Sequence, residues 1–224
     1  MAGHYGPWPG PTLKRALNGG SLFSEVQAAG GRAQLANLYP PGYFRAVAAG
    51  RQRENVPVYA AKAAGLRLKT LEDYRQGAAV GVDLSGNYLR KLDASLPQFT
   101  PRELGRQLAA VAQRADFTFF DFWPTDGTGH RASFGEAVAL VENLDAFLAG
   151  VVESLGDVTL LLTSDHGNLE DKTTRSHTLA PVPLLVLGSQ ASVFDGASSL
   201  LDVAPGVRGA LGLTASARRA VEAG

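Results

Sequence analysis

Hydrophobic residues recur at steps of three and four along residues 133–155, and this spacing predicts a long amphipathic helix that faces a core. A second helix is predicted over residues 100–114, because a capping Thr is followed by Pro at the first helical position and then by Glu. The other helical patterns are shorter. They cover residues 21–29, 43–49, 56–64, 71–78, 200–211 and 215–223.

Apolar runs of strand length lie between these helices. Residues 116–122 form a run rich in aromatic side chains, and residues 158–163 and 182–188 form two runs rich in Leu and Val. An earlier strand is predicted over residues 33–38. The long helix between the first two runs has the size of a parallel crossover connection. The pattern therefore predicts an α/β fold with a mostly parallel sheet flanked by helices.

Two segments depart from this alternation. Residues 1–20 are rich in Gly and Pro and are predicted to form an irregular loop, in which Thr12 after Pro11 could open a short helix. Residues from about 40 to 100 lack strong strand patterns and are interpreted as a small helical cap or insertion. With 224 residues, the chain is expected to form a single domain spanning residues 1–224 that includes this insertion.

Composition narrows the possible partners. The formal net charge is zero and there is no run of Lys or Arg, so neither nucleic acid nor an anionic membrane surface is an expected partner. The chain has no Cys, so any metal must be held by Asp and His. No signal pattern or membrane span is evident, and a cytoplasmic location is expected.

Polar residues with metal-binding chemistry follow two of the predicted strands. The run 158–163 leads into Asp165 and His166, and the run 116–122 leads to Asp126 and His130. Open α/β sheets place their ligands at the carboxyl ends of strands, and adjacent oxygen and nitrogen donors suit Zn or Mn. The spacing of Asp126 and His130 puts both on one face of a helix, although the glycines between them would also permit a tight loop.

Several separate motifs resemble one known family. Residues 163–168 (Thr-Ser-Asp-His-Gly-Asn), then His177-Thr178, then residues 181–183 (Pro-Val-Pro) resemble the C-terminal metal motif of the alkaline phosphatase superfamily. The nearest branch is the cofactor-independent phosphoglycerate mutase-like metalloenzymes, whose upstream metal motif resembles Asp126-x-x-x-His130. Residues 201–205 with 211–213 resemble the closing helix and turn, so the resemblance covers residues from about 116 to 213.

The resemblance implies an alkaline phosphatase-like core with two divalent metal ions, Mn or Zn. One metal would be held by Asp126, His130 and His177, and the other by Asp165 and His166. Asn168 and Arg175 are expected to orient ligands or a bound phosphate. Lys172 is a further candidate for a phosphate contact.

The resemblance also implies a first strand that ends in a metal-binding Asp, followed by a Ser or Thr nucleophile. No Asp occurs before Asp73, so this carboxylate and the nucleophile are expected to be missing from the chain, with Met1 inside a longer reading frame. The catalytic nucleophile is then unknown. The second metal, with only two protein ligands, is expected to bind weakly, so this chain would hold either two metals or only one.

Two functions follow from the resemblance. The first is metal-dependent phosphoryl transfer on a small phosphorylated substrate, as a phosphoesterase rather than a mutase, because residues 40–100 are too short for the mutases' substrate-binding domain. The alternative is a truncated or degenerate, non-catalytic metal-binding member of the same family. A sheet without its first strand would expose an edge, so association into a homo-oligomer is also expected.

Overall fold

The computed structural model describes residues 8–18 and 20–213, so the predicted helix 215–223 lies outside the described residues. The helices are α1 (Pro11–Asn18), α2 (Leu22–Ala28), α3 (Pro41–Ala48), α4 (Val56–Ala63), α5 (Leu71–Arg75), α6 (Asn87–Leu92), α7 (Pro101–Ala112), α8 (Pro124–Arg131), α9 (Phe134–Glu153) and α10 (Val203–Ala210). The strands are β1 (Ala33–Leu35), β2 (Phe117–Phe119), β3 (Leu160–Thr163) and β4 (Leu184–Leu187). Two short 3-10 helices, η1 (Ala191–Phe194) and η2 (Leu200–Asp202), precede α10.

The strands form two small sheets. β1 pairs with β2 in parallel, with Ala33 opposite Phe117, whereas β3 pairs with β4 in antiparallel orientation, with Leu160 opposite Leu187. The α/β class is confirmed, but the mostly parallel sheet is not: parallel pairing is minimal within the described residues. No helix lies in the connection from β3 to β4, so this connection does not cross over and β4 returns beside β3 in the opposite direction.

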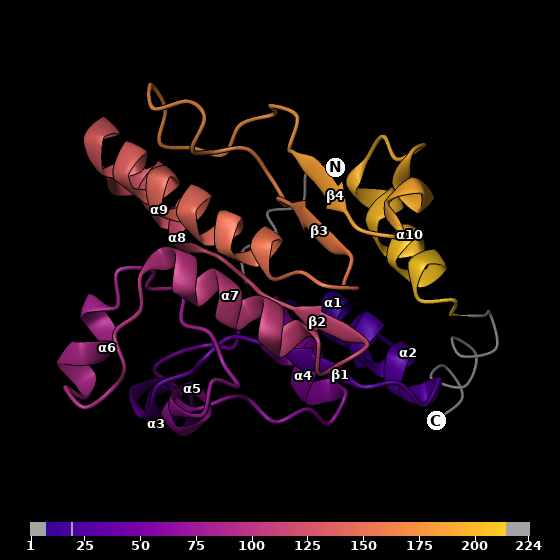
Figure 1. Cartoon of the computed structure of the whole chain (residues 1–224), viewed down its shortest axis with the longest axis horizontal. Coiled ribbons are helices and arrows are strands. Elements are labelled where there is room, and N and C mark those ends of the chain that lie inside the picture. Colours follow the sequence, from indigo (N-terminus) through magenta and orange to yellow (C-terminus); the bar gives the residue numbers. More distant parts are fainter. Residues whose placement is uncertain (1–7, 19, 214–224) are drawn as a thin grey trace.

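Helices α7 and α9 run side by side through the molecule (Figure 1) and bury the main apolar cluster between them and the segments around them. Two glycines allow this approach. A Cβ built at Gly105 would lie 1.9 Å from the Phe147 carbonyl oxygen, and one built at Gly150 would lie 1.9 Å from the Arg102 carbonyl oxygen. Close backbone contact of this kind admits no side chain. At the helix surface, Arg106 pairs with Glu153 at 3.0 Å.

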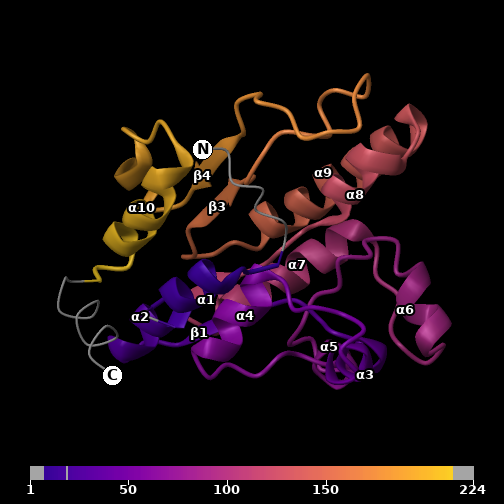
Figure 2. The same cartoon turned by 180° about the vertical axis from the view of Figure 1, so that it is seen from behind.

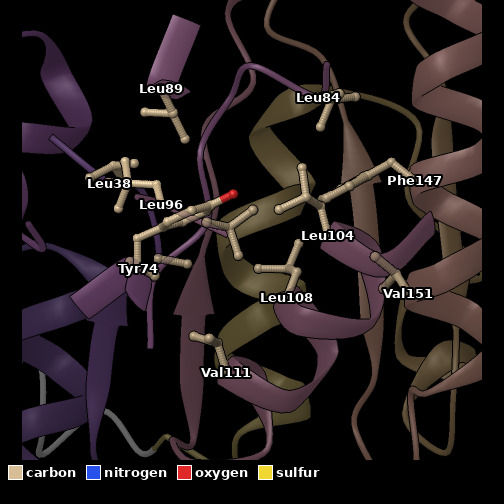
Figure 3. Packing of buried hydrophobic residues seen from close by; sticks show 13 residues of the cluster. Leu38, Tyr74, Leu84, Leu89, Leu96, Leu104, Leu108, Val111, Phe147 and Val151 are labelled. Carbon is tan, nitrogen blue, oxygen red and sulfur yellow. The ribbon is translucent and has the colours of Figure 1, made fainter. Parts of the chain in front are cut away.

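The main cluster also holds the segments that lead to the candidate site. Figure 3 shows Tyr74, Leu104, Leu108 and Phe147 packed together. Aromatic side chains just after β2 and Leu160 at the start of β3 pack against the same cluster. The end of β2 and the start of β3 are therefore held to a shared core.

A second cluster joins the N-terminal helices to β1. Phe23 of α2, Leu35 of β1 and Val58 of α4 are buried in it. The C-terminal helix α10 is tied to this part of the molecule, because Arg208 donates to the buried Glu25 carboxylate at 2.6 and 2.8 Å. The view from behind shows α10 on the same side as α2 (Figure 2).

The predicted helices over residues 100–114 and 133–155 are confirmed as α7 and α9, with caps at Thr100 and Ser133. Within the irregular loop predicted for residues 1–20, residues 11–18 form the helix α1, in agreement with the short helix that Thr12 after Pro11 could open. The flanking Gly and Pro residues mark the ends of this helix, with Pro11 at its first position, where proline is tolerated.

Strand β4 has exposed apolar side chains. Leu184, Leu185 and Leu187 of β4 are exposed, although association into a homo-oligomer stays a prediction. Within residues 8–18 and 20–213, no helix combines the length and apolar character needed to cross a bilayer.

Candidate metal centre

Asp126 and His130 lie on one face of helix α8. Pro124 occupies the start of this helix, so the helical alternative for the Asp-x-x-x-His segment is the one adopted. His130 Nε2 lies 3.1 Å from Asp126 Oδ1, one helical turn away. Asp126 is in the first turn, where the helix dipole favours negative charge.

His177 reaches the same point from the loop between β3 and β4. Its Nε2 lies 3.2 Å from Asp126 Oδ1 and 3.2 Å from His130 Nε2. The ligand atoms of the three side chains all lie within 4.8 Å of one another. Among the residues that the structure describes, this is the one group of three or more such donors.

Asp165 and His166 lie beside this group. His166 Nε2 is 3.9 Å from Asp126 Oδ1, and the His166 ring stacks on that of His177 with centroids 3.6 Å apart. Asp165 Oδ2 is 3.6 Å from His166 Nε2, but the Asp165 side chain is 87% exposed. The structure thus brings four of the five predicted ligands into mutual proximity and leaves the Asp165 carboxylate at the solvent edge.

Asn168 supports Asp126. The side chain of Asn168 is buried, and its Nδ2 donates to Asp126 Oδ1 at 2.8 Å. Gly129 makes room for it, because a Cβ at Gly129 would lie 2.1 Å from Asn168 Oδ1. Arg175 is exposed, and it is its main-chain carbonyl that accepts a hydrogen bond from His130 Nδ1, at 2.5 Å.

The donor set fits a divalent cation. Because His130 Nδ1 donates to a carbonyl, the hydrogen-bond pattern assigns its Nε2 as the free lone pair, and this atom faces His177 and Asp126. Outer-shell bonds to His130 and Asp126 are what metal sites use to orient their ligands. One carboxylate and two imidazoles suit Zn or Mn.

Charge and burial tune the carboxylates of the site in opposite directions. Partial burial acts to raise the pKa of Asp126, but the Asn168 hydrogen bond and the three nearby imidazoles outweigh it and lower the pKa. Burial and the nearby Asp165 charge raise the pKa of Asp121 to about 6, against a hydrogen bond from Asn55.

Sequence reasoning missed Asp121 and its supports. Asn37, which is fully buried, exchanges two hydrogen bonds with the Asp121 backbone, and Asn55 Nδ2 donates to Asp121 Oδ2 at 3.1 Å. Both Asn residues come from the part of the chain that carries no recognisable motif. The one feature of the sequence that could have pointed to Asp121 is the presence of a carboxylate within the aromatic run at 116–122.

Comparison with known proteins gives a consistent result. A family model described as the Metalloenzyme superfamily matches residues 96–215. The 2,3-bisphosphoglycerate-independent phosphoglycerate mutase of Aliivibrio fischeri is 37% identical over 120 residues, which is 49% of this chain and 24% of the relative. The protein of the same name from Serratia proteamaculans is 37% identical over 128 residues, or 52% of this chain and 25% of the relative.

The protein of that name from Legionella pneumophila is 30% identical over 129 residues, 53% of this chain and 25% of the relative. The matched part of the chain thus spans about a quarter of the length of these relatives. The family model, in contrast, covers more than half of this chain and includes every residue of the candidate centre. The chain therefore belongs to the Metalloenzyme superfamily.

Proposed function

We propose that this chain binds a divalent metal ion at the cluster of Asp126, His130 and His177. We further propose that it acts in phosphoryl transfer, as a phosphoesterase on a small phosphorylated substrate. The observation that carries the proposal is the convergence of Asp126, His130 and His177 within 4.8 Å. The relatives' printed name, a phosphoglycerate mutase, supports a phosphorylated substrate.

Asp126 supplies the negative charge of the centre, and His130 and His177 supply neutral nitrogen donors. His166 and the exposed Asp165 lie beside them and offer donors for a second ion. A divalent cation at such a site polarises a phosphoryl oxygen and stabilises developing negative charge. Mn and Zn are the proposed ions.

The residues around the cluster have separate tasks. Asn168 holds the Asp126 carboxylate, and the Arg175 carbonyl holds the His130 ring. The exposed Arg175 guanidinium is proposed to bind phosphate oxygens, for which its planar fork of donors is well suited.

Hydrolysis is favoured over mutase chemistry by the placement of residues 40–100. Buried residues of this segment, such as Tyr74 and Leu89, belong to the same cluster as α7 and α9. This packing supports the phosphoesterase proposal, because a segment that shares the core of α7 and α9 is less suited to act as a separate substrate-binding domain.

Hydrolysis of p-nitrophenyl phosphate by metal-free protein, with Mn²⁺ or Zn²⁺ added back, tests this function. Metal-dependent release of p-nitrophenol is expected from the wild type, with loss of activity in Asp126→Asn and Asp165→Ala. Equal rates in wild type and Asp126→Asn, or no metal-dependent release, would reject the phosphoesterase.

A second candidate function is non-catalytic metal binding. It is favoured by the exposed Asp165 and by the presence of one three-donor group among the described residues. In that case one equivalent of metal raises the Tm of the wild type but no phosphate ester is hydrolysed. The two functions therefore differ in metal stoichiometry and in turnover.

A further inference from the structure

Lys172 contacts the backbone of helix α8 directly before a proposed metal ligand. Its Nζ donates to the carbonyl oxygens of Thr128 at 2.8 Å and of Gly129 at 2.9 Å. Both carbonyls belong to the last turn of α8, where a cation is favoured by the helix dipole. The Thr128 carbonyl also accepts a hydrogen bond from Ala132 N at 3.0 Å. The residue after Gly129 is His130.

The segment that carries Lys172 has a closed base. Thr178 N donates to the Gly167 carbonyl at 2.9 Å, which pairs the two ends of the loop. The Glu170 carboxylate accepts hydrogen bonds from Asn168 N and from the Thr178 hydroxyl across that base. Because these bonds restrain the loop, a lysine within it can restrain the position of the helix that it contacts.

The same loop also supplies a ligand and holds two others. His177 lies next to its closing pair, Asn168 binds Asp126, and the Arg175 carbonyl binds His130. Asn168 Nδ2 also donates to the Asp126 main-chain carbonyl at 3.2 Å, in the first turn of α8, whereas Lys172 binds the carbonyls of the last turn. Another hydrogen bond from the loop to this last turn is the one between the Arg175 carbonyl and the ring of His130.

We propose that Lys172 is a positioning residue of the metal centre, an inference that rests on the proposed metal-binding function. By fixing the last turn of α8 against the loop, Lys172 keeps the imidazoles of His130 and His177 within reach of a common cation. It acts through the helix backbone. We prefer this role to the phosphate contact expected from the sequence, because two of the three ammonium donors bind helix carbonyls.

Titration calorimetry with Zn²⁺ alone on the metal-free chain tests the proposal. Supports outside the ligand sphere typically contribute about 10–100-fold to metal affinity. Lys172→Met is expected to weaken Zn²⁺ binding by that factor, and Lys172→Arg, which keeps a cationic donor, is expected to restore most of it. Lys62→Met is the matched control, because Lys62 pairs with Glu54 on a different part of the chain.

Two further measurements separate positioning from general stability. The circular dichroism and Tm of metal-free Lys172→Met are expected to stay close to those of the wild type, and Lys172→Gln provides a second variant if the first does not fold. The visible absorption spectrum of the Co²⁺-loaded protein is expected to change in Lys172→Met and to return in Lys172→Arg, because it reports ligand geometry.

The outcomes are distinguishable. If the wild type binds no Zn²⁺, the proposed metal-binding function is rejected, and the positioning role is rejected with it. If the wild type binds Zn²⁺ and Lys172→Met binds it equally, the positioning role alone is rejected. Unchanged Zn²⁺ affinity with weaker binding of inorganic phosphate would identify Lys172 as a phosphate contact and would also overturn the proposal.

Discussion

Gly129 of α8 lies directly against the side chain of Asn168, so closely that a Cβ at position 129 would be 2.1 Å from Asn168 Oδ1. This contact lets a buried amide from the β3–β4 loop reach the Asp126 carboxylate at 2.8 Å. Of the two glycines between the proposed ligands of α8, Gly129 is therefore required for space, and any larger residue at this position must displace Asn168.

Gly129→Ala is expected to weaken Zn²⁺ binding by about 10-fold or more, because the displaced Asn168 no longer orients Asp126. Gly127→Ala is the matched control on the same helix, since nothing lies within 4 Å of a Cβ at Gly127. It is expected to keep Zn²⁺ affinity and to gain up to about 1 kcal/mol of stability from higher helix propensity. Equal Zn²⁺ affinities in the two variants would contradict the role of the contact.

The α7–α9 crossing gives a second paired test. Gly150→Ala places a methyl group 1.9 Å from the Arg102 carbonyl, which forces the two backbones apart and is expected to cost about 1–3 kcal/mol. Gly135→Ala, also on α9, meets nothing within 4 Å and is expected to be neutral or stabilising. Urea denaturation of both variants measures the difference, and a Gly150→Ala protein as stable as Gly135→Ala would rule out the close packing.

Asp73 is expected to make a pH-dependent contribution to stability. Arg67 donates to both oxygens of this buried carboxylate, at 2.6 and 2.7 Å, and these bonds, with those from Thr70, outweigh burial and lower its pKa. A depressed pKa means that the stabilisation is present above the unfolded pKa of about 3.9 and is lost as pH falls below it.

Asp73→Asn is therefore expected to lower stability by about 1–2 kcal/mol at pH 7, a modest value because the Arg67 side chain is well exposed to solvent. The gap to the wild type should narrow as the pH is lowered below about 4. Glu72→Gln serves as the control, since the Glu72 side chain is 61% exposed. A gap that does not change with pH, measured by Tm from pH 2 to 7, would argue against the ion pair.

Asp121 is expected to show the opposite dependence. Its raised pKa, about 6, means that its contribution to stability is complete below the unfolded pKa of about 3.9 and is lost as pH rises through 6. The free energy of unfolding of metal-free Asp121→Asn should therefore rise relative to that of the wild type as the pH increases from 4 to 7. The expected change in this difference is on the order of 1–3 kcal/mol. Thermal unfolding across this range measures it, and a constant offset between the two proteins would count against the raised pKa.

The sequence predicts the long elements well and their pairing poorly. The amphipathic stripe that becomes α9 and the capping residues that begin α7 are local signals, and both helices form where predicted. The antiparallel pairing of β3 with β4 depends on the path of the irregular connection between them. No local sequence pattern predicts that path. The length of α1 was not predicted, because the Gly and Pro residues beside it indicate a loop.

The proximity of Asp126, His130, His166 and His177 follows from strand ends and from the family resemblance, and the structure places these side chains together. Their roles as ligands stay predictions. Lys172 and Gly129 could not be assigned in advance, because their contacts join residues more than 35 positions apart without any periodic pattern. The spacing of the motifs predicts the candidate metal ligands. The residues that hold these ligands in place can be identified only from the folded structure.

Titration of the metal-free chain with Zn²⁺, compared with the variant Asp126→Asn/His130→Ala/His177→Ala, tests the central claim most directly. Saturable binding of at least one Zn²⁺ per wild-type chain and its loss in the triple variant is the predicted result. Zn²⁺ binding of equal affinity and stoichiometry in both proteins, or none in a folded wild type, would contradict the proposed metal centre.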